Sequence, residues 1–262
     1  MNNLLIKIKE FDAHGGPSTK RTGLDGHEMT PTRNGRYIVG AVEKHISYGK
    51  YAYWSGVAWG AGLKFIGDVT YVDVNNNGHW QKLSTYRPIW LNYFKTEMAI
   101  KNAIKVGWQK LKVTQYSGGE ISWYDAELPD RWLFNDFGHV SVKYFVDRNH
   151  DGIMNRGESF MGDFIHTTPH DEAVTSYNRR ALATQPRYVV NLAESHGCVH
   201  VKPADVDVMI GSGYIKKGQS IVVHSYSDKN IMPTIKADPY TRPGFEVHFF
   251  PGLFKIAVYK VT

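Results

Sequence analysis

The sequence predicts a mainly β fold, arranged as one domain with short helices and a helical insertion. Of its 262 residues, 13% are aromatic, including 16 tyrosines and 7 tryptophans. Such side chains are favoured in strands and on half-buried surfaces rather than in helical bundles. The 25 glycines favour many turns. A chain of this length, 42% hydrophobic, can bury a sizeable core in one large domain or two small ones.

Four strands are expected in the first third of the chain, where apolar and polar residues alternate: 3–11, 36–45, 50–59 and 71–80. A loop rich in Gly, Pro and Thr separates the first two strands. The fourth strand runs into a tight turn, because three asparagines and a glycine follow its apolar start.

The clearest helix is predicted over residues 93–111. Ile100, Ile104 and Trp108 recur there at helical spacing, while lysines occupy other positions around the helix. We expect this helix to pack its apolar face on a sheet, within a helical insertion of about residues 85–135.

The strand pattern returns after residue 137, at 138–147, 158–168, 216–226 and twice within 244–261, where Pro251-Gly252 separates the two strands. Polar residues 171–187 predict a helical or irregular segment. A short helix is expected from Pro203, because proline is favoured in the first turn of a helix. We therefore expect residues 1–225 to form the main domain and residues 226–262 to add a C-terminal β extension packed on it.

Composition narrows the classes of partner. The formal net charge is +6, but no run of Lys or Arg marks a nucleic-acid-binding segment. No apolar run approaches the roughly 18 to 20 residues of a membrane span, so no transmembrane segment is expected. The N-terminal residues also lack the apolar run and cleavage site of a Sec signal peptide. The chain is therefore expected to be a mature form or to be exported by a non-Sec route.

Cys198 is the single cysteine of the chain, so it forms no internal disulfide and builds no thiolate zinc cluster. It could be a small buried hydrophobic residue or a nucleophile. A nucleophilic thiol needs a nearby base or positive charge to lower its pKa, and His166, His170, His196 and His200 are the candidates. The preceding glycine permits a tight turn, and the amides of residues 197 and 198 could hold a developing oxyanion.

Three motifs around this cysteine resemble one enzyme family in the family's own order. "SHGCVHVKPADVDVMIGSGYIKKGQSIVV" resembles the active-site segment of L,D-transpeptidases (the YkuD type). "FIHTTP" and "TPTRNGRYIV" resemble the family's histidine-bearing strand end and its upstream signature. The match covers roughly residues 25–225. It implies a YkuD-like β-sandwich or barrel domain.

The resemblance also implies roles for individual residues. Cys198 takes the position of the nucleophile, His166 that of its base, and Thr167 that of the residue whose carbonyl orients the base. Ser195, His196 and Gly197 complete the motif. The implied reaction is attack of the thiolate on a peptidoglycan stem peptide at the carbonyl of its L-centred diamino acid, with loss of D-Ala. A second stem's amine or water then resolves the thioester, and no cofactor is required.

The sequence departs from the family pattern at several positions. His200 stands where the family has Arg or Asn. It is therefore a candidate substrate-binding residue that would alter the choice of substrate. Thr167 replaces a glycine. The interval between His166 and Ser195 is longer than in the family, so His170 could compete as the base.

A calcium-like loop precedes the histidine motif. "DRNHDGIMNRGE" fits the twelve-residue pattern of calcium loops, with ligands expected from five residues: Asp147, Asn149, Asp151, the carbonyl of Ile153, and Glu158. Its flanks read as strands rather than helices. A calcium site and a metal-free turn therefore both remain open. The similar stretch Asp73–Gly78 has Ser84 at the twelfth position and is predicted to be a turn.

Three function classes remain. The first is a peptidoglycan cysteine acyltransferase, acting as transpeptidase, L,D-carboxypeptidase, endopeptidase or D-amino-acid exchange enzyme. The second is a sortase-like cysteine protease, and the third a non-catalytic wall-binding module. The expected place of action is the periplasm or cell wall. A non-Sec route suggests a secreted antibacterial effector, whose partners would be secretion machinery and an immunity protein.

Overall fold

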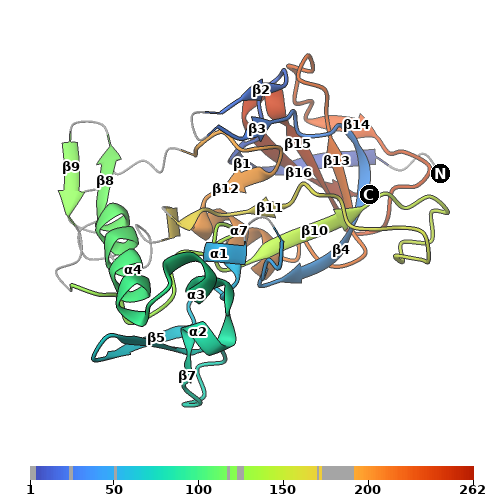
Figure 1. The fold of residues 1–262 in the computed structure, drawn as a ribbon. Coiled ribbons are helices and arrows are strands. Elements are labelled where there is room, and N and C mark those ends of the chain that lie inside the picture. The colour runs from blue at the N-terminus through green and yellow to red at the C-terminus, as the bar shows by residue number, and fades with distance from the viewer. Residues whose placement is uncertain are drawn as a thin grey trace. The chain divides into compact units, whose positions relative to one another are not determined.

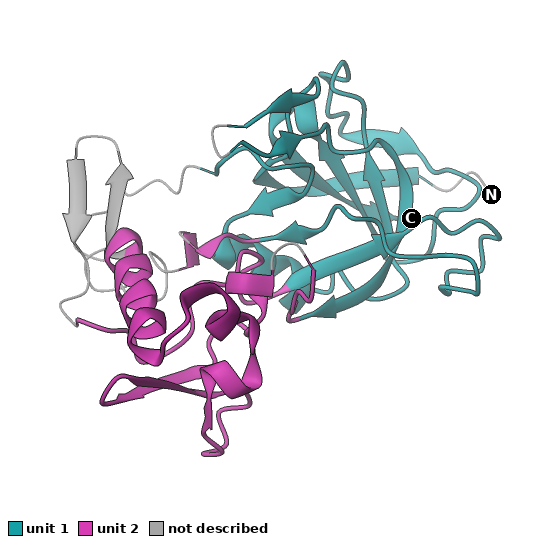
Figure 2. Ribbon diagram, viewed as in Figure 1, with its two compact units in different colours: residues 1–43, 141–166, 192–262 teal, residues 44–140, 167–191 magenta. Residues whose placement is uncertain are grey.

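The computed structural model describes residues 4–23, 26–49, 52–116, 119–122, 127–169, 171–172 and 192–262. The protein is mainly β, with a large mixed sheet and a few short helices (Figure 1). It divides into two compact units (Figure 2). Unit 1 comprises Met1–Glu43, Ser141–His166 and Leu192–Thr262, and unit 2 comprises Lys44–Val140 and Thr167–Asn191. The predicted insertion at 85–135 thus lies within a unit that begins earlier in the chain.

Unit 1 is built on a nine-stranded sheet in the order β12-β11-β10-β4-β13-β15-β16-β1-β14. Its strands are β1 (Leu4–His14), β4 (Gly35–Glu43), β10 (Ser141–Phe145), β11 (Ile165–His166), β12 (Val199–Val201), β13 (Ser220–Val223), β14 (Thr234–Lys236), β15 (Phe245–Phe250) and β16 (Lys255–Val261). A short separate pair joins β2 (Arg21–Thr22) to β3 (Glu28–Met29). The additional pairing of β1 with β12 closes the large sheet on itself.

The length of β1 makes this closure possible. Its residues 4–6 pair with β14 on one side and residues 5–12 pair with β16, while its last two residues, Ala13 and His14, pair with Val201 and His200 of β12. A register shift between Lys7 and Lys9 marks a bulge, which bends and twists a strand. The strand predicted at 3–11 is confirmed, and it extends further than its alternating pattern indicated.

The predicted C-terminal strands are integral to unit 1. β15 and β16 form an antiparallel pair joined by the short helix η1 (Pro251–Leu253), as the Pro-Gly break indicated. Phe249 and Ile256 are fully buried between their neighbours. The predicted helix after Pro203 is also confirmed as α7 (Pro203–Gly211), which buries Val206 and Met209 and leads to β13.

Unit 2 gathers helices and short strands around an aromatic core. Its elements are α1 (Ala52–Ser55), β5 (Gly62–Ile66), β6 (Val69–Asp73), β7 (Gln81–Lys82), α2 (Leu83–Tyr86), α3 (Ile89–Phe94), α4 (Glu97–Lys112), β8 (Val113–Tyr116) and β9 (Gly119–Ser122). Trp90, Trp108 and Trp132 are fully buried in this core.

The predicted helix at 93–111 is found as α4, with Ile100, Ile104 and Trp108 fully buried on its inner face as their spacing indicated. It begins later than predicted, because Lys95 takes a left-handed conformation (φ 68°) and separates it from α3.

Two strand predictions are wrong. Residues 52–59 do not form a strand, since α1 lies within them and their aromatic side chains join the tryptophan core; residues 50 and 51 lie outside the described residues. Within 158–168 only β11 is a strand, because Gly162 and Asp163 lie in a loop whose carboxylate binds Arg33. The turn at Asp73–Gly78 is confirmed, with the Asp73 carboxylate accepting the N–H groups of Asn77 and Gly78. Most of the polar segment 171–187 lies outside the described residues.

Candidate active site

The predicted base lies in the parallel strand pair β11–β12, and the predicted nucleophile directly precedes β12. Ile165 pairs with Val199 and His166 with His200. Side chains two positions apart in a strand share a face, and directly paired residues also share a face. His200 and His166 therefore lie on one face, and Cys198 lies in the turn directly before β12. The rings of His166 and His200 meet edge to face, with centroids 4.9 Å apart.

A third histidine extends this row onto β1. His14 pairs with His200 across the antiparallel contact that closes the sheet. Its Nδ1 lies 3.0 Å from the Gly15 carbonyl, and its ring stacks on Phe254. His14, His200 and His166 thus occupy adjacent positions on three neighbouring strands. Sequence reasoning missed His14, because only the bulged course of β1 brings it to this position.

The Cys198 sulfur is half-buried and contacts the loop before β11. It accepts a hydrogen bond from the Phe164 N–H at 3.4 Å, and the thiol points to the Gly162 carbonyl at 3.9 Å. Burial raises the pKa of Cys198 to about 12; the Phe164 N–H opposes this shift, and the Asp163 carboxylate adds to it. The surroundings of the thiol in the free protein therefore act against the lowered pKa expected from the sequence.

His200 is held as a neutral imidazole. Burial lowers its pKa to about 4, although the hydrogen bond to the Ala193 carbonyl opposes the shift; His14 and His196 lower it further. Nδ1 lies 2.8 Å from the Ala193 carbonyl oxygen, which can only accept. The proton of the neutral ring therefore resides on Nδ1, and Nε2 carries a lone pair. This is the tautomer that a general base needs.

The Ser-His-Gly-Cys turn is fixed by its own side chains. The buried Ser195 hydroxyl donates to the Cys198 carbonyl and accepts the Gly197 N–H at 3.0 Å. Gly197 has φ +129°, a conformation that favours glycine. Because its N–H is engaged by Ser195, Gly197 is not an oxyanion donor in this arrangement. In the part of the chain that the structure describes, the Cys198 N–H has no hydrogen-bond partner and can serve that role.

Loops from the N-terminal part of unit 1 support this turn. The Ser195 N–H donates to the Gly15 carbonyl at 3.0 Å, and the Thr30 hydroxyl donates to the His196 carbonyl at 3.0 Å. The Tyr226 hydroxyl ties the two loops together, since it donates to the Gly16 carbonyl at 2.7 Å and accepts the Thr32 N–H at 3.1 Å. The side chain of His196 is exposed. Tyr226 was not found from the sequence, because it follows β13 in a stretch without a motif.

Asp163 and Arg33 form an ion pair near the nucleophile. Nε and Nη2 of Arg33 donate to the two carboxylate oxygens of Asp163 at 3.1 and 3.3 Å. Asp163 stands between the two residues that contact the Cys198 sulfur. A Cβ on Gly197 would lie 3.2 Å from Asp163 Oδ1. Sequence reasoning missed both members of this pair.

Thr167 follows the base and belongs to unit 2. It is fully buried, and its hydroxyl donates to the Glu172 carboxylate. The same oxygen of Glu172 accepts the His139 backbone N–H at 2.8 Å and contacts the His139 ring. Glu172 therefore anchors the chain directly after the predicted base. His170, the competing candidate for the base, lies outside the described residues.

The calcium-like loop is closed by its own hydrogen bonds. Asp147 accepts the Gly152 N–H, Asp151 accepts the Ile153 N–H, and Glu158 accepts the backbone N–H groups of Arg148 and Asn155. The Asn149 amide also donates to the Asp151 carboxylate.

The contacts of Asp147 bear on whether this loop fits calcium. Its second oxygen is buried without a hydrogen-bond partner, which a cation would satisfy. However, Arg242 lies 3.9 Å from the first oxygen and supplies a positive charge. Across the described residues, no three His, Cys, Asp or Glu side chains converge as a metal site requires. With its carboxylates engaged by backbone N–H groups and Arg242 beside Asp147, the loop as arranged favours the metal-free turn of the two alternatives that the sequence left open.

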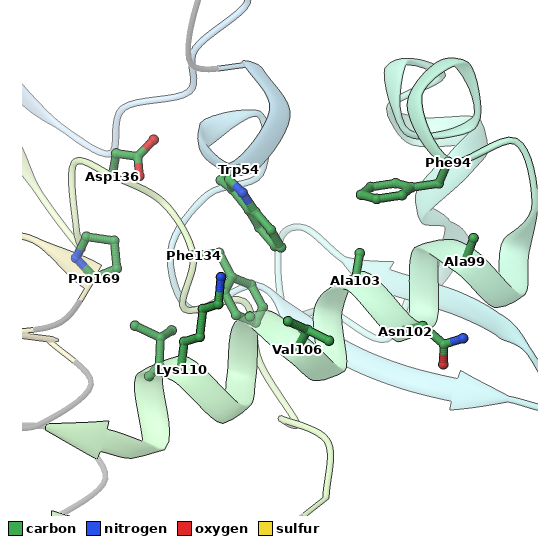
Figure 3. A pocket seen from close by; sticks show the side chains of 12 residues that line it. Trp54, Phe94, Ala99, Asn102, Ala103, Val106, Lys110, Phe134, Asp136 and Pro169 are labelled. Carbon is green, nitrogen blue, oxygen red and sulfur yellow. The ribbon is translucent and has the colours of Figure 1, made fainter. Parts of the chain in front are cut away.

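Unit 2 contains an apolar pocket of its own, of about 670 Å³ (Figure 3). Val106 and Lys110 of α4 line one side, and Trp54 and Phe134 of the aromatic core line another (Figure 3). Burial raises the pKa of Asp136 at its edge, and a hydrogen bond from Ser55 opposes that shift. None of the residues proposed for catalysis lines this pocket.

The chain matches no protein-family model, no curated protein and no solved structure. The resemblance to L,D-transpeptidases therefore rests on the three sequence motifs. No helix in the described ranges has the length and apolar character that crossing a bilayer requires.

Proposed function

We propose that the protein is a cysteine acyltransferase of the L,D-transpeptidase type that acts on peptidoglycan stem peptides. The observation that supports this proposal is the position of Cys198 in the turn directly before β12, whose His200 pairs with His166 of β11. The three motifs supply the substrate class, and the contact of the Cys198 sulfur with the Phe164 N–H, two residues before His166, supports a thiol near the imidazole. No cofactor enters the reaction.

The proposed reaction begins when an imidazole removes the thiol proton of Cys198. The sulfur attacks the carbonyl carbon of the L-centred diamino acid, and the Cys198 N–H stabilises the oxyanion. The C–N bond to D-Ala then breaks, and the proton held by the imidazole passes to the leaving amine. An amine of a second stem, a free D-amino acid or water attacks the resulting thioester and restores the thiol.

His166 is the proposed base, and His200 lies beside it as a neutral partner. The edge-to-face contact fixes the two rings relative to each other. Because His200 remains uncharged above about pH 4, it does not repel a proton that arrives on His166. Its Nε2 lone pair provides an acceptor beside the base. We propose that this pair, in place of the family's Arg or Asn, positions the substrate.

A non-catalytic wall-binding module is the second candidate, and the raised pKa of Cys198 favours it. A thiol with a pKa of about 12 is almost entirely protonated at neutral pH. Under the enzymatic proposal the base must take the proton during attack. Labelling with iodoacetamide while stem peptide is bound separates the two, since only the enzymatic proposal requires the substrate to change thiol reactivity.

The proposed substrate lies outside the cytoplasm, so we propose action in the periplasm or cell wall. A secreted antibacterial effector, with secretion machinery and an immunity protein as partners, is one form of this proposal. Toxicity after export to the periplasm, but not after synthesis in the cytoplasm, is the expected result. Equal harmlessness in both compartments contradicts the effector role.

Incubation with defined muropeptides followed by mass analysis tests the proposed activity. Loss of D-Ala, a crosslinked dimer or exchange of the terminal D-amino acid distinguishes carboxypeptidase, transpeptidase and exchange reactions. Unchanged muropeptides with every combination of donor and acceptor contradict the enzymatic proposal.

A further inference from the structure

A second pocket, of about 640 Å³, lies in unit 1, and its Thr30 and Asp163 lie against Gly197 of the Ser-His-Gly-Cys turn. Thr30, Arg33, Asp163 and Tyr226 are among the residues that line it. Two of these hold the Ser-His-Gly-Cys turn, because Thr30 donates to the His196 carbonyl and Tyr226 joins the supporting loops. Asp163 stands between the two residues that contact the Cys198 sulfur. A ligand in this pocket would therefore lie against the turn that carries Cys198.

The ion pair leaves both charges able to bind a ligand. Arg33 uses one N–H from Nε and one from Nη2 to hold Asp163, and the guanidinium carries further N–H donors. Its side chain is 55% exposed, whereas that of Asp163 is 12% exposed. A carboxylate accepts several hydrogen bonds, so the oxygens of Asp163 can still accept from a cation. One pocket thus presents a guanidinium and a carboxylate side by side.

We propose that this pocket binds a zwitterionic α-amino acid group, with Asp163 accepting hydrogen bonds from its ammonium and Arg33 donating to its carboxylate. The inference rests on the proposed function. The group could come from the free end of a diamino acid side chain in the acyl donor, or from a free amino acid that accepts the acyl group. Both sources carry the same chemistry, and the tests below separate them.

Ligand binding at Asp163 also affects the nucleophile. The Asp163 carboxylate contributes to the raised pKa of Cys198, because a negative charge disfavours the thiolate. A bound ammonium offsets that charge and makes thiolate formation easier. The pocket therefore couples recognition of the correct substrate to activation of the thiol.

The test compares four tetrapeptide stems that differ only at the third residue. These carry diaminopimelate, its side-chain amide, its side-chain N-acetyl derivative, or lysine. Release of D-Ala is measured for the wild type, Arg33→Gln and Asp163→Asn, with Lys236→Gln on the exposed edge of β14 as the charge-matched control. Loss of a charged hydrogen bond predicts a decrease in kcat/KM of about tenfold or more.

The two variants should lose different preferences. Arg33→Gln should remove the preference for the free carboxylate over the amide, and Asp163→Asn should remove the preference for the free ammonium over the acetylated amine. If the ligand is instead a free D-amino acid, the KM for that amino acid in the exchange reaction should rise in Arg33→Gln. The preference among the four acyl-donor stems should then stay unchanged. Identical preferences in the wild type and both variants overturn the proposal.

Two further measurements keep this inference separate from the proposed function. Asp163→Asn should increase the rate of Cys198 alkylation at pH 8 to 9, whereas a purely structural role of the ion pair predicts no such increase. Calorimetric binding of the four stems to Cys198→Ser protein tests the pocket without turnover. Selective binding of the stems, with no release of D-Ala by the wild type, would uphold the pocket and contradict the acyltransferase proposal. Release of D-Ala without selectivity among the stems would uphold the acyltransferase proposal and contradict the pocket.

Discussion

His166 and His200 lie directly opposite each other on neighbouring parallel strands, with their rings edge to face and 4.9 Å apart. Cys198 precedes His200 by two residues and lies in the turn directly before β12, where its sulfur contacts the Phe164 N–H at 3.4 Å. The nucleophile, the proposed base and the residue that departs from the family pattern are therefore placed by one short strand pair. A change in the register of this pair would separate all three.

The reactivity of Cys198 should have an unusual pH dependence. Because only the thiolate is alkylated, the rate with iodoacetamide should follow a pKa near 12 and keep rising well above pH 9 in the free protein. In denaturant the rate should level off near the ordinary value of 9.0. Kinetics measured from pH 6 to 12 check this, and a plateau near neutral pH in the folded protein would show that a thiolate already exists.

His200 should make the protein less stable in acid. Its pKa is lowered from 6.5 to about 4, so the unfolded chain binds more protons between these values. The free energy of unfolding should therefore fall as the pH drops through this window. His200→Asn should reduce the slope of the unfolding free energy against pH by the equivalent of up to about one bound proton. Denaturant unfolding at several pH values measures the slope, with His79→Asn at an exposed turn as the control. Equal slopes for wild type and His200→Asn would refute this account.

Gly197 should tolerate no side chain. Alanine there would hold φ at +129° with its Cβ 3.0 Å from the Thr30 hydroxyl. We expect Gly197→Ala to lose about 1 to 3 kcal/mol of unfolding free energy and to slow acylation. In Gly211→Ala no atom lies within 4 Å of the new Cβ, so a change within about 0.5 kcal/mol is expected. Similar unfolding midpoints for the two variants would contradict the tight packing of the turn.

The loop from Asp147 to Glu158 should keep its stability without calcium. Its carboxylates accept backbone N–H groups, and Arg242 lies 3.9 Å from Asp147. We therefore expect equal melting temperatures in EDTA and in excess Ca²⁺, and no heat of binding in calorimetry. A calcium-dependent rise that Asp151→Asn abolishes would instead establish the calcium site.

The parts of the site that could be predicted are those encoded locally. Cys198 and His200 are two positions apart in the sequence, so the turn and the short strand that carry them keep them close together. His166 was placed by a motif at a strand end. Likewise, α7 was predictable because Pro203 and the apolar residues after it are contiguous in the sequence.

The remaining features depend on contacts between distant segments. His14 reaches the site because a bulge redirects β1, and no pattern within β1 marks which residue will pair with His200. Arg33 and Asp163 meet across two loops, and neither loop has a regular period. The raised pKa of Cys198 arises chiefly from burial, which a neighbouring histidine in the sequence does not reveal.

The most direct test of the central claim is intact-protein mass analysis after incubation with a diaminopimelate tetrapeptide stem and rapid acid quenching. Wild-type protein should gain the mass of the stem minus D-Ala as a hydroxylamine-sensitive thioester. Cys198→Ala should gain nothing while keeping the wild-type circular dichroism spectrum and melting temperature. The same adduct on Cys198→Ala, or an adduct on neither protein while the stem remains intact, would contradict the assignment of Cys198 as the nucleophile.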